Sequence, residues 1–413
     1  MFIKRSILPI IIQCAEEYPV TLVTGARQVG KTTLVSYFEK EKNYKYISLD
    51  DSDLLLQAKE NPKSFLEKYK YPLIIDEVQK ATSLFAEIEK NVNEVKRKEG
   101  SLAANGMYIL TGSQKYSLMK EISESMSGRV GIIEMPPLSQ CEIQKWDEKP
   151  FVVNNDNLYS KCDIRSLNDD DLYTSIVRGF YPARWEIEGK PIKNFYSNYV
   201  KTYIERDVSQ LINLKDKLKF ENMLKMLASL TGEELIIDNI SKTIGVDNKT
   251  INEWLSIVVT GDIVSLLQPY YEDSINKRIV KRNKLYFNDT GLACYLLGID
   301  STKTLKLSTF KGRMIETYIH NEIVKSYLNN GINPNIFYYR DNNQNEIDLI
   351  LLNDGKLNLM ECKSGKKYNS ADIKGFSQLN KTRYEIEGKC IICTTENIYR
   401  IAPATYSYPI CSI

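Results

Sequence analysis

Short apolar runs alternate with longer segments of helical periodicity through the first 150 residues. Strands that alternate with helices in this way form a parallel sheet with helices on both of its faces. We therefore predict an α/β domain of this kind for residues 1–150. The expected strands are residues 20–24, 44–49, 73–75, 107–110 and 130–134.

The rest of the chain changes its pattern three times. Residues 151–225 open with a polar, acidic stretch and continue with helical spacing, which predicts a helical lid and connector. Residues 226–304 contain short helical segments followed by a hairpin, the pattern of a winged helix-turn-helix. Residues 305–413 return to mixed helix and strand. A chain of 413 residues is too long for one core, which agrees with several domains.

A glycine-rich loop separates the first predicted strand from the helix after it. Residues 25–32 read Gly-Ala-Arg-Gln-Val-Gly-Lys-Thr, the pattern of a P-loop. The backbone N–H groups of such a loop and the N-terminus of the following helix bind phosphate. Lys31 would reach the β- and γ-phosphates of ATP, and Thr32 would place its hydroxyl on Mg²⁺. The expected ATP-binding residues are Gly25, Ala26, Arg27, Gln28, Val29, Gly30, Lys31, Thr32 and Thr33.

Two acids end the predicted strand at residues 73–75. Asp76 and Glu77 stand at its carboxyl end, the edge at which an α/β sheet binds its ligand. Asp76 would hold Mg²⁺ through water, and Glu77 would polarise the water that attacks the γ-phosphate. The alternative is a strand that ends in ordinary solvated acids, which is the weaker interpretation after a P-loop.

Together these motifs resemble the prokaryotic AAA-type ATPases that carry a C-terminal domain of unknown function. The resemblance includes Leu-Thr-Gly-Ser at 110–113 and Ser-Met-Ser-Gly-Arg at 125–129, and it continues through residues 199–208, 287–293 and 312–316. It therefore covers nearly the whole chain. It implies ATP hydrolysis with Mg²⁺ and a homo-oligomer that depends on nucleotide.

The resemblance also implies roles for residues outside the P-loop. Ser113, with Thr111 as the alternative, would help to place the attacking water, on a strand between the P-loop strand and the one ending in Asp76. Arg129 matches the arginine finger that completes a neighbouring subunit's site; the alternative is an arginine that anchors a helix C-terminus. Pro182 resembles the proline that packs on adenine, although a simple turn between helices explains it equally well.

Basic residues gather on the hairpin that follows the helix-turn-helix. Gly245 would allow the tight turn between the two helices, and Asp247 would cap the second helix. Winged helices of this kind bind the phosphates of duplex DNA; the alternative is a module that docks on protein. The expected DNA contacts are Lys277, Arg278, Lys281, Arg282 and Lys284.

Acids and a lysine recur in order near the C-terminus. Asp348 lies in one predicted strand, and Glu361 and Lys363 project from the same face of the next. This order resembles restriction-endonuclease-like folds, in which acids hold Mg²⁺ and a lysine orients the attacking water. The expected metal ligands are Glu316, Asp348 and Glu361, with Lys363 beside them and Glu346 as an accessory. Either phosphodiester cleavage or binding without cleavage remains open.

Composition narrows the functional classes. The formal net charge is only +2, so any basic patch must be local. Eight scattered cysteines favour a reducing compartment, and a single histidine, His320, excludes His-rich metal sites. No segment is apolar for long enough to cross a membrane, so we expect a cytoplasmic protein. The prediction is an ATPase coupled to a DNA-acting C-terminal region; the alternative is a nucleotide-dependent switch without nuclease activity.

Overall fold

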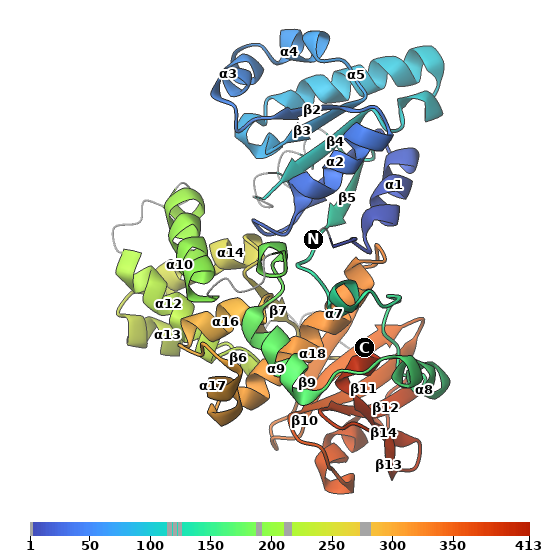
Figure 1. The fold of residues 1–413 in the computed structure, drawn as a ribbon, viewed down its shortest axis with the longest axis vertical. Helices are drawn as coiled ribbons and strands as arrows, with labels where there is room; N and C mark the ends of the chain where they lie inside the picture. Colours follow the sequence, from blue (N-terminus) through green and yellow to red (C-terminus); the bar gives the residue numbers. More distant parts are fainter. Residues whose placement is uncertain are drawn as a thin grey trace.

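The computed structural model describes residues 3–113, 118, 122, 126–186, 192–209, 217–272 and 282–413. Its N-terminal part, at the top of Figure 1, is a sheet of five parallel strands in the order β2-β3-β4-β1-β5. β4 lies between the P-loop strand β1 and β3, as predicted, and the α/β fold class is confirmed. The strands are β1 (Val20–Thr24), β2 (Lys45–Ser48), β3 (Leu73–Asp76), β4 (Tyr108–Gly112) and β5 (Val130–Glu134).

Helices cover both faces of this sheet, so β1, β3 and β4 are buried along their whole length. Leu22 packs into the core that includes α5, whereas its neighbour Val23 packs into the core that includes α1 and α2. Parallel strands covered on both faces read as continuous apolar runs, which is why their positions could be predicted. The helices are α1 (Leu8–Glu17), α2 (Lys31–Glu41), α3 (Ser52–Glu60), α4 (Pro62–Lys68) and α5 (Leu84–Glu99).

The helices expected to form one lid occupy two places. α8 (Asn155–Ile164) packs against the C-terminal part, where the ring of Tyr159 lies 6.2 Å from the rings of Tyr406 and Tyr408. α9 (Asp169–Arg178) instead packs on α16 (Thr290–Leu296), whose Thr290 hydroxyl donates to the Ile176 carbonyl at 2.8 Å. Residues 151–225 are therefore divided between two neighbours. The other helices of this region are α7 (Gln140–Gln144), α10 (Ile192–Tyr203) and α17 (Thr302–Leu307).

Three helices and a small antiparallel sheet form the middle unit. Gly245, with φ of 72°, ends one helix, and the Asp247 carboxylate caps the next by accepting from the Thr250 N–H at 2.9 Å. Both residues act as the sequence predicted. The helices are α12 (Lys217–Ser229), α13 (Ile237–Ile244) and α14 (Asn248–Thr260), and the sheet order is β6 (Glu233–Glu234), β8 (Lys284–Phe287), β7 (Val264–Leu267).

A mixed sheet forms the C-terminal part, and α18 (Lys311–Leu328) lies between it and the middle unit (Figure 1). The strand order is β13-β14-β12-β11-β10-β9, with β11, β12 and β14 parallel to one another. Because α18 packs on both neighbours, it is buried along most of its length. The strands are β9 (Ile336–Arg340), β10 (Glu346–Asn353), β11 (Lys356–Lys363), β12 (Glu385–Cys393), β13 (Tyr399–Ala402) and β14 (Thr405–Pro409).

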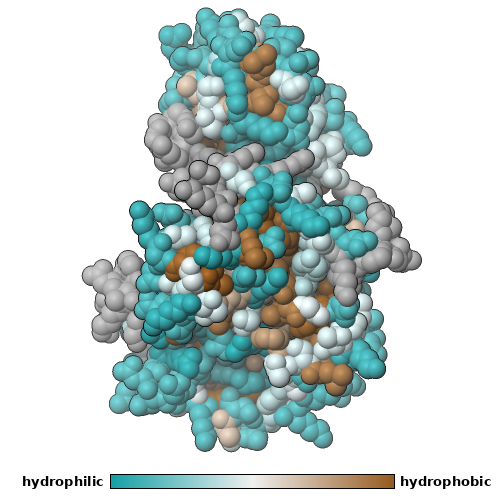
Figure 2. Space-filling model, turned by 90° about the vertical axis from the view of Figure 1, so that its left-hand side faces the viewer, coloured by the Kyte–Doolittle hydropathy of each residue, from teal (hydrophilic) through white to brown (hydrophobic). Residues whose placement is uncertain are grey.

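The surface seen in Figure 2 is mainly hydrophilic, and its hydrophobic residues form small patches. Among the helices that the structure describes, none combines the length and the apolar character needed to cross a bilayer.

Candidate functional site

The loop between β1 and α2 has the backbone geometry of a tight phosphate-binding turn. Gly25 has φ of 145°, and a Cβ atom there would stand 2.3 Å from the carbonyl oxygen of Met135, so only glycine fits. Gly30, with φ of 96°, precedes the first residue of α2. Both glycines therefore meet backbone requirements that residues with side chains would not meet at these positions.

Lys31 is buried within this loop. Its Nζ donates to the carbonyl oxygens of Gly25 and Ala26, both at 2.8 Å. Burial lowers the pKa of Lys31 to about 8, and Glu77 is the largest of the opposing influences. The ammonium is thus mostly protonated at neutral pH and lies where a phosphate would need a positive charge.

Asp76 collects three hydroxyl groups at the end of β3. Its carboxylate accepts from Thr32 Oγ1 at 3.0 Å, from Tyr46 OH at 2.7 Å and from Thr111 Oγ1. The sequence predicted Thr32 and Asp76 as partners but missed Tyr46, which comes from the neighbouring strand β2. A hydroxyl beside a carboxylate is a pair of hard oxygen donors, so the arrangement fits Mg²⁺.

Glu77 follows Asp76 in a backbone conformation that is unusual for a residue with a side chain. Its φ of 58° lies in the left-handed region, which is sparsely populated and concentrated at functional sites. Its carboxylate accepts from Gln79 Nε2, which also lies 3.4 Å from Ser113 Oγ. Gln79, missed by the sequence, therefore links the predicted catalytic acid to the predicted water-placing hydroxyl, whereas Thr111 contacts Asp76.

An open pocket lies beside the P-loop and the first turn of α2. Its empty volume is about 360 Å³, and it is lined by Val29, Gly30, Leu138 and Pro182 among others. The Pro182 ring stands 3.6 Å from where a Cβ of Gly30 would be. The structure thus brings Pro182 to the P-loop from far along the chain, and its packing on adenine stays a prediction.

Arg5, which the sequence analysis missed, braces the same loop. Its guanidinium donates to the Val29 carbonyl at 2.8 Å and to the Pro136 carbonyl at 2.7 Å, and it pairs with Glu142 at 2.9 Å. Arg5 and Glu142 are both buried. The arginine joins the N-terminal segment, the P-loop and the chain after β5, a set of contacts for which the sequence offers no local signal.

Arg129 contacts its own domain. Its guanidinium donates to Asn93 Oδ1 at 2.9 Å and pairs with Glu89 at 3.2 Å, both on α5. These contacts fit the alternative of a local anchor, and the role between subunits stays a prediction.

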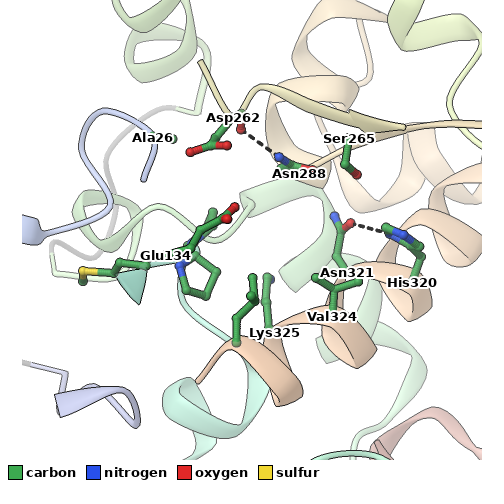
Figure 3. Close-up of a pocket in the computed structure, with 13 residues that line it drawn as sticks. Ala26, Glu134, Asp262, Ser265, Asn288, His320, Asn321, Val324 and Lys325 are labelled. Carbon is green, nitrogen blue, oxygen red and sulfur yellow. Dashed lines mark hydrogen bonds between the residues drawn. The ribbon is translucent and has the colours of Figure 1, made fainter. Parts of the chain in front are cut away.

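A second pocket, of about 510 Å³, lies between the P-loop, the middle unit and α18. Figure 3 shows Asp262, from the turn between α14 and β7, pointing toward Ala26 of the P-loop. Asp262 is one of the charges that raise the pKa of Lys31 against the dominant lowering by burial. On the far wall, burial lowers the pKa of His320 to about 4, so this imidazole is neutral, and it stacks on Tyr286.

Four carboxylates meet where the middle unit joins the C-terminal part; we call Glu316, Glu346, Asp348 and Glu361 the acid cluster. Lys363 Nζ lies 2.6 Å from Glu361 and 3.5 Å from Asp348, as the predicted motif requires. Lys284, however, also enters the cluster. Its Nζ lies 2.5 Å from Glu346 and 3.3 Å from Glu316.

One prediction is corrected by this arrangement. Lys284 is buried rather than exposed for DNA, and burial disfavours its charge, but Glu316 and the other carboxylates outweigh that and hold its pKa well above the usual value. Within the described ranges, no three His, Cys, Asp or Glu residues are placed to hold a metal ion. Lys284 and Lys363 contact the acids of the cluster, and the role of Glu316, Asp348 and Glu361 as metal ligands stays a prediction.

Of the four other predicted DNA contacts on the hairpin, only Arg282 is among the described residues. Its side chain is 59% exposed and lies 4.0 Å from Glu234. Lys277, Arg278 and Lys281 lie outside the described residues.

Comparison with protein-family models divides the chain into three matched segments. Residues 17–144 match a model described as an AAA domain. Residues 169–303 and 311–412 match two models described as domains of unknown function, DUF8612 and DUF4143. The first match covers the five-stranded sheet with its P-loop, so the N-terminal domain is similar to AAA domains.

Individual relatives are similar over most of the chain. An uncharacterized protein of Mycobacterium tuberculosis is 25% identical over 340 residues, which cover 82% of this chain and 68% of that protein. An uncharacterized protein of Methanocaldococcus jannaschii is 23% identical over 377 residues, covering 88% and 79%.

Solved structures are similar at a lower level. A Walker-type ATPase of Pyrococcus abyssi covers 70% of this chain and 94% of its own at 15% identity, with a TM-score of 0.43. A signal transduction ATPase with numerous domains from Pyrococcus horikoshii covers 77% of this chain and 45% of its own at 11% identity, with a TM-score of 0.27.

Proposed function

We propose that this protein binds ATP at the P-loop and hydrolyses it with Mg²⁺. The observation that supports the proposal most is the convergence of four predicted residues from separate segments. Lys31 lies inside the loop, Thr32 donates to Asp76 at 3.0 Å, and Glu77 follows Asp76 at the end of β3. This set supplies a positive charge, two oxygen donors and a second acid around one anion-binding turn.

Each residue has a distinct part in the proposed reaction. Lys31 would neutralise the β- and γ-phosphates, and Thr32 and Asp76 would hold Mg²⁺, which when bound offsets charge on the same oxygens. Glu77 would accept a proton from water as the water oxygen bonds to the γ-phosphorus and the bond to ADP breaks. Ser113, linked to Glu77 through Gln79, would help to orient that water.

Phosphate release from full-length protein tests the proposal. We expect Lys31→Ala and Glu77→Gln to abolish turnover, because they remove charge neutralisation and the proton acceptor. Lys63→Ala and Glu67→Gln are the matched controls, since both side chains are exposed on α4 and lie 74% and 64% open to solvent. Equal turnover in Glu77→Gln and Glu67→Gln would refute the assignment of Glu77.

A second candidate function is a nucleotide-dependent switch, and Asp262 favours it. Its carboxylate faces the P-loop from another domain and influences Lys31. The highly negative polyphosphate of ATP would repel this carboxylate, because charges separated by a few ångström interact strongly in a partly buried site. ATP binding would therefore push the α14–β7 turn away from the loop.

Small-angle scattering of Glu77→Gln with and without ATP tests the switch. The expected result is an expansion on ATP binding that is smaller in Glu77→Gln/Asp262→Asn. An unchanged scattering profile in both variants would contradict it. Light scattering on the same samples measures whether ATP also drives the predicted homo-oligomer.

For the middle unit we retain the hypothesis of a winged helix that contacts duplex DNA without sequence preference. Among described basic residues of the hairpin, exposed Arg282 supports it, whereas Lys284 is withdrawn from it. DNA affinity that falls with added salt, and that weakens in Arg282→Glu, is the expected result. Affinity insensitive to both would favour docking on protein.

A further inference from the structure

Lys284 is the first residue of β8, yet its side chain belongs to the acid cluster of the neighbouring part. Its Nζ lies 2.5 Å from Glu346, 3.3 Å from Glu316 and 4.0 Å from Asp348. These acids come from β10 and α18, whereas Lys284 comes from the middle unit. One ammonium therefore touches three carboxylates across an interface, and only 2% of the side chain is exposed.

The other donors of the acid cluster are also in place. Glu316 accepts from the Tyr286 hydroxyl at 2.7 Å. Asp348 accepts from the Cys362 N–H at 2.8 Å. Lys363 forms ion pairs with both Glu361 and Asp348. Each acid thus has a donor within the protein, as buried carboxylates require.

A divalent cation bound by Glu316, Glu346 and Asp348 together would need the position that Lys284 Nζ holds. Mg²⁺ and Mn²⁺ demand oxygen ligands at short range in a nearly octahedral shell. An ammonium in contact with three of the carboxylates excludes such an ion by volume and by repulsion between like charges. The acid cluster is consequently complete without metal.

We propose that Lys284 takes the place of a metal ion in the acid cluster, which is an ionic joint fastening β8 to α18 and β10. The joint also has a consequence at the other end of β8. Asn288, just after this strand, donates through its side chain to the Asp262 carbonyl at 3.0 Å and through its backbone to Ile263 at 3.0 Å. The lysine thereby fixes the strand whose next residue, Asn288, is hydrogen-bonded to the turn that faces the P-loop.

Manganese binding to the full-length protein without nucleotide tests the proposal, with free Mn²⁺ followed by electron paramagnetic resonance. Wild type should show no site that depends on Asp348. Lys284→Met should gain one Mn²⁺ site per chain that depends on Asp348, because removing a contacting like charge relieves strong repulsion. Asp348→Asn added to Lys284→Met should abolish that site.

Lys356→Met is the matched control, since this lysine on β11 pairs with Glu387 at 3.5 Å outside the cluster and should gain no site. A wild-type Mn²⁺ site that Asp348→Asn removes would overturn the proposal, and this comparison needs no Lys284 variant to fold. Failure of folded Lys284→Met to bind Mn²⁺ would also overturn it. Neither result bears on ATP hydrolysis, because Asp348 lies outside the P-loop site.

Discussion

The buried ammonium of Lys31 predicts a pH dependence of ATP binding that an ordinary lysine would not give. Burial sets the pKa of Lys31 at about 8, whereas an exposed lysine titrates near 10.5. The phosphates of ATP bind the protonated, positively charged form of Lys31. Raising the pH through 8 therefore neutralises Lys31 in the free protein. Above that pH, ATP binding must be accompanied by uptake of a proton from solvent onto Lys31, which weakens the affinity for ATP.

The magnitude follows from the fraction of protein that is charged. With a pKa of about 8, roughly three quarters of Lys31 is protonated at pH 7.5 and about 3% at pH 9.5. If the phosphates keep the bound lysine charged throughout, the Kd for ATP rises about 25-fold over this range. An unshifted lysine would change the Kd only slightly over the same interval.

Isothermal titration calorimetry in buffers of different ionisation enthalpy measures both Kd and proton uptake. We expect uptake of nearly one proton per ATP at pH 9.5 and little at pH 7.5. Lys31→Arg is the control, because a guanidinium stays charged and should give a flat profile. A wild-type Kd that is constant from pH 7.5 to 9.5 would refute the account of a buried, partly neutralised lysine.

Three further predictions concern the residues that shape the site. Gly25→Ala should abolish ATP binding by calorimetry, because its Cβ would meet a carbonyl at 2.3 Å, whereas Gly298→Ala, also at positive φ but in open space, should bind normally; equal binding by both would contradict the steric argument. Arg5→Met should lower the unfolding free energy by about 3–5 kcal/mol in urea titrations, since it removes the charged partner of the buried acid Glu142; a loss below about 1 kcal/mol would argue against it. Mixing inactive Arg129→Ala with inactive Lys31→Ala should restore part of the ATPase rate if the arginine acts between subunits, and no recovery at any ratio would favour the local anchor.

Sequence reasoning succeeded where function depends on consecutive residues. The P-loop is one short segment whose glycines, lysine and hydroxyl have fixed spacing. Asp76 and Glu77 could be added because the carboxyl ends of parallel strands share an edge. Ser113 was proposed in the same way, because it follows the end of another predicted strand of this sheet.

Contacts between distant segments were invisible to the same reasoning. Tyr46 joins the site through strand order and Arg5 through packing, and no spacing along the chain reveals either contact. Gln79, in contrast, stands only two positions after Glu77. Lys284 shows the opposite error: it lies in a run of basic residues that resembles an exposed patch, yet folding buries it among acids 32 to 64 positions away. A charge pattern along a sequence does not report burial.

Nucleotide retention by Glu77→Gln tests the central claim most directly. Protein incubated with labelled ATP and Mg²⁺ is separated from free nucleotide, and the bound fraction is identified by chromatography. We predict that Glu77→Gln retains intact ATP while wild type retains ADP, since Lys31, Thr32 and Asp76 bind the nucleotide and Glu77 is needed only for the attack of water. Bound ADP in Glu77→Gln at the wild-type rate of formation would contradict the proposed mechanism.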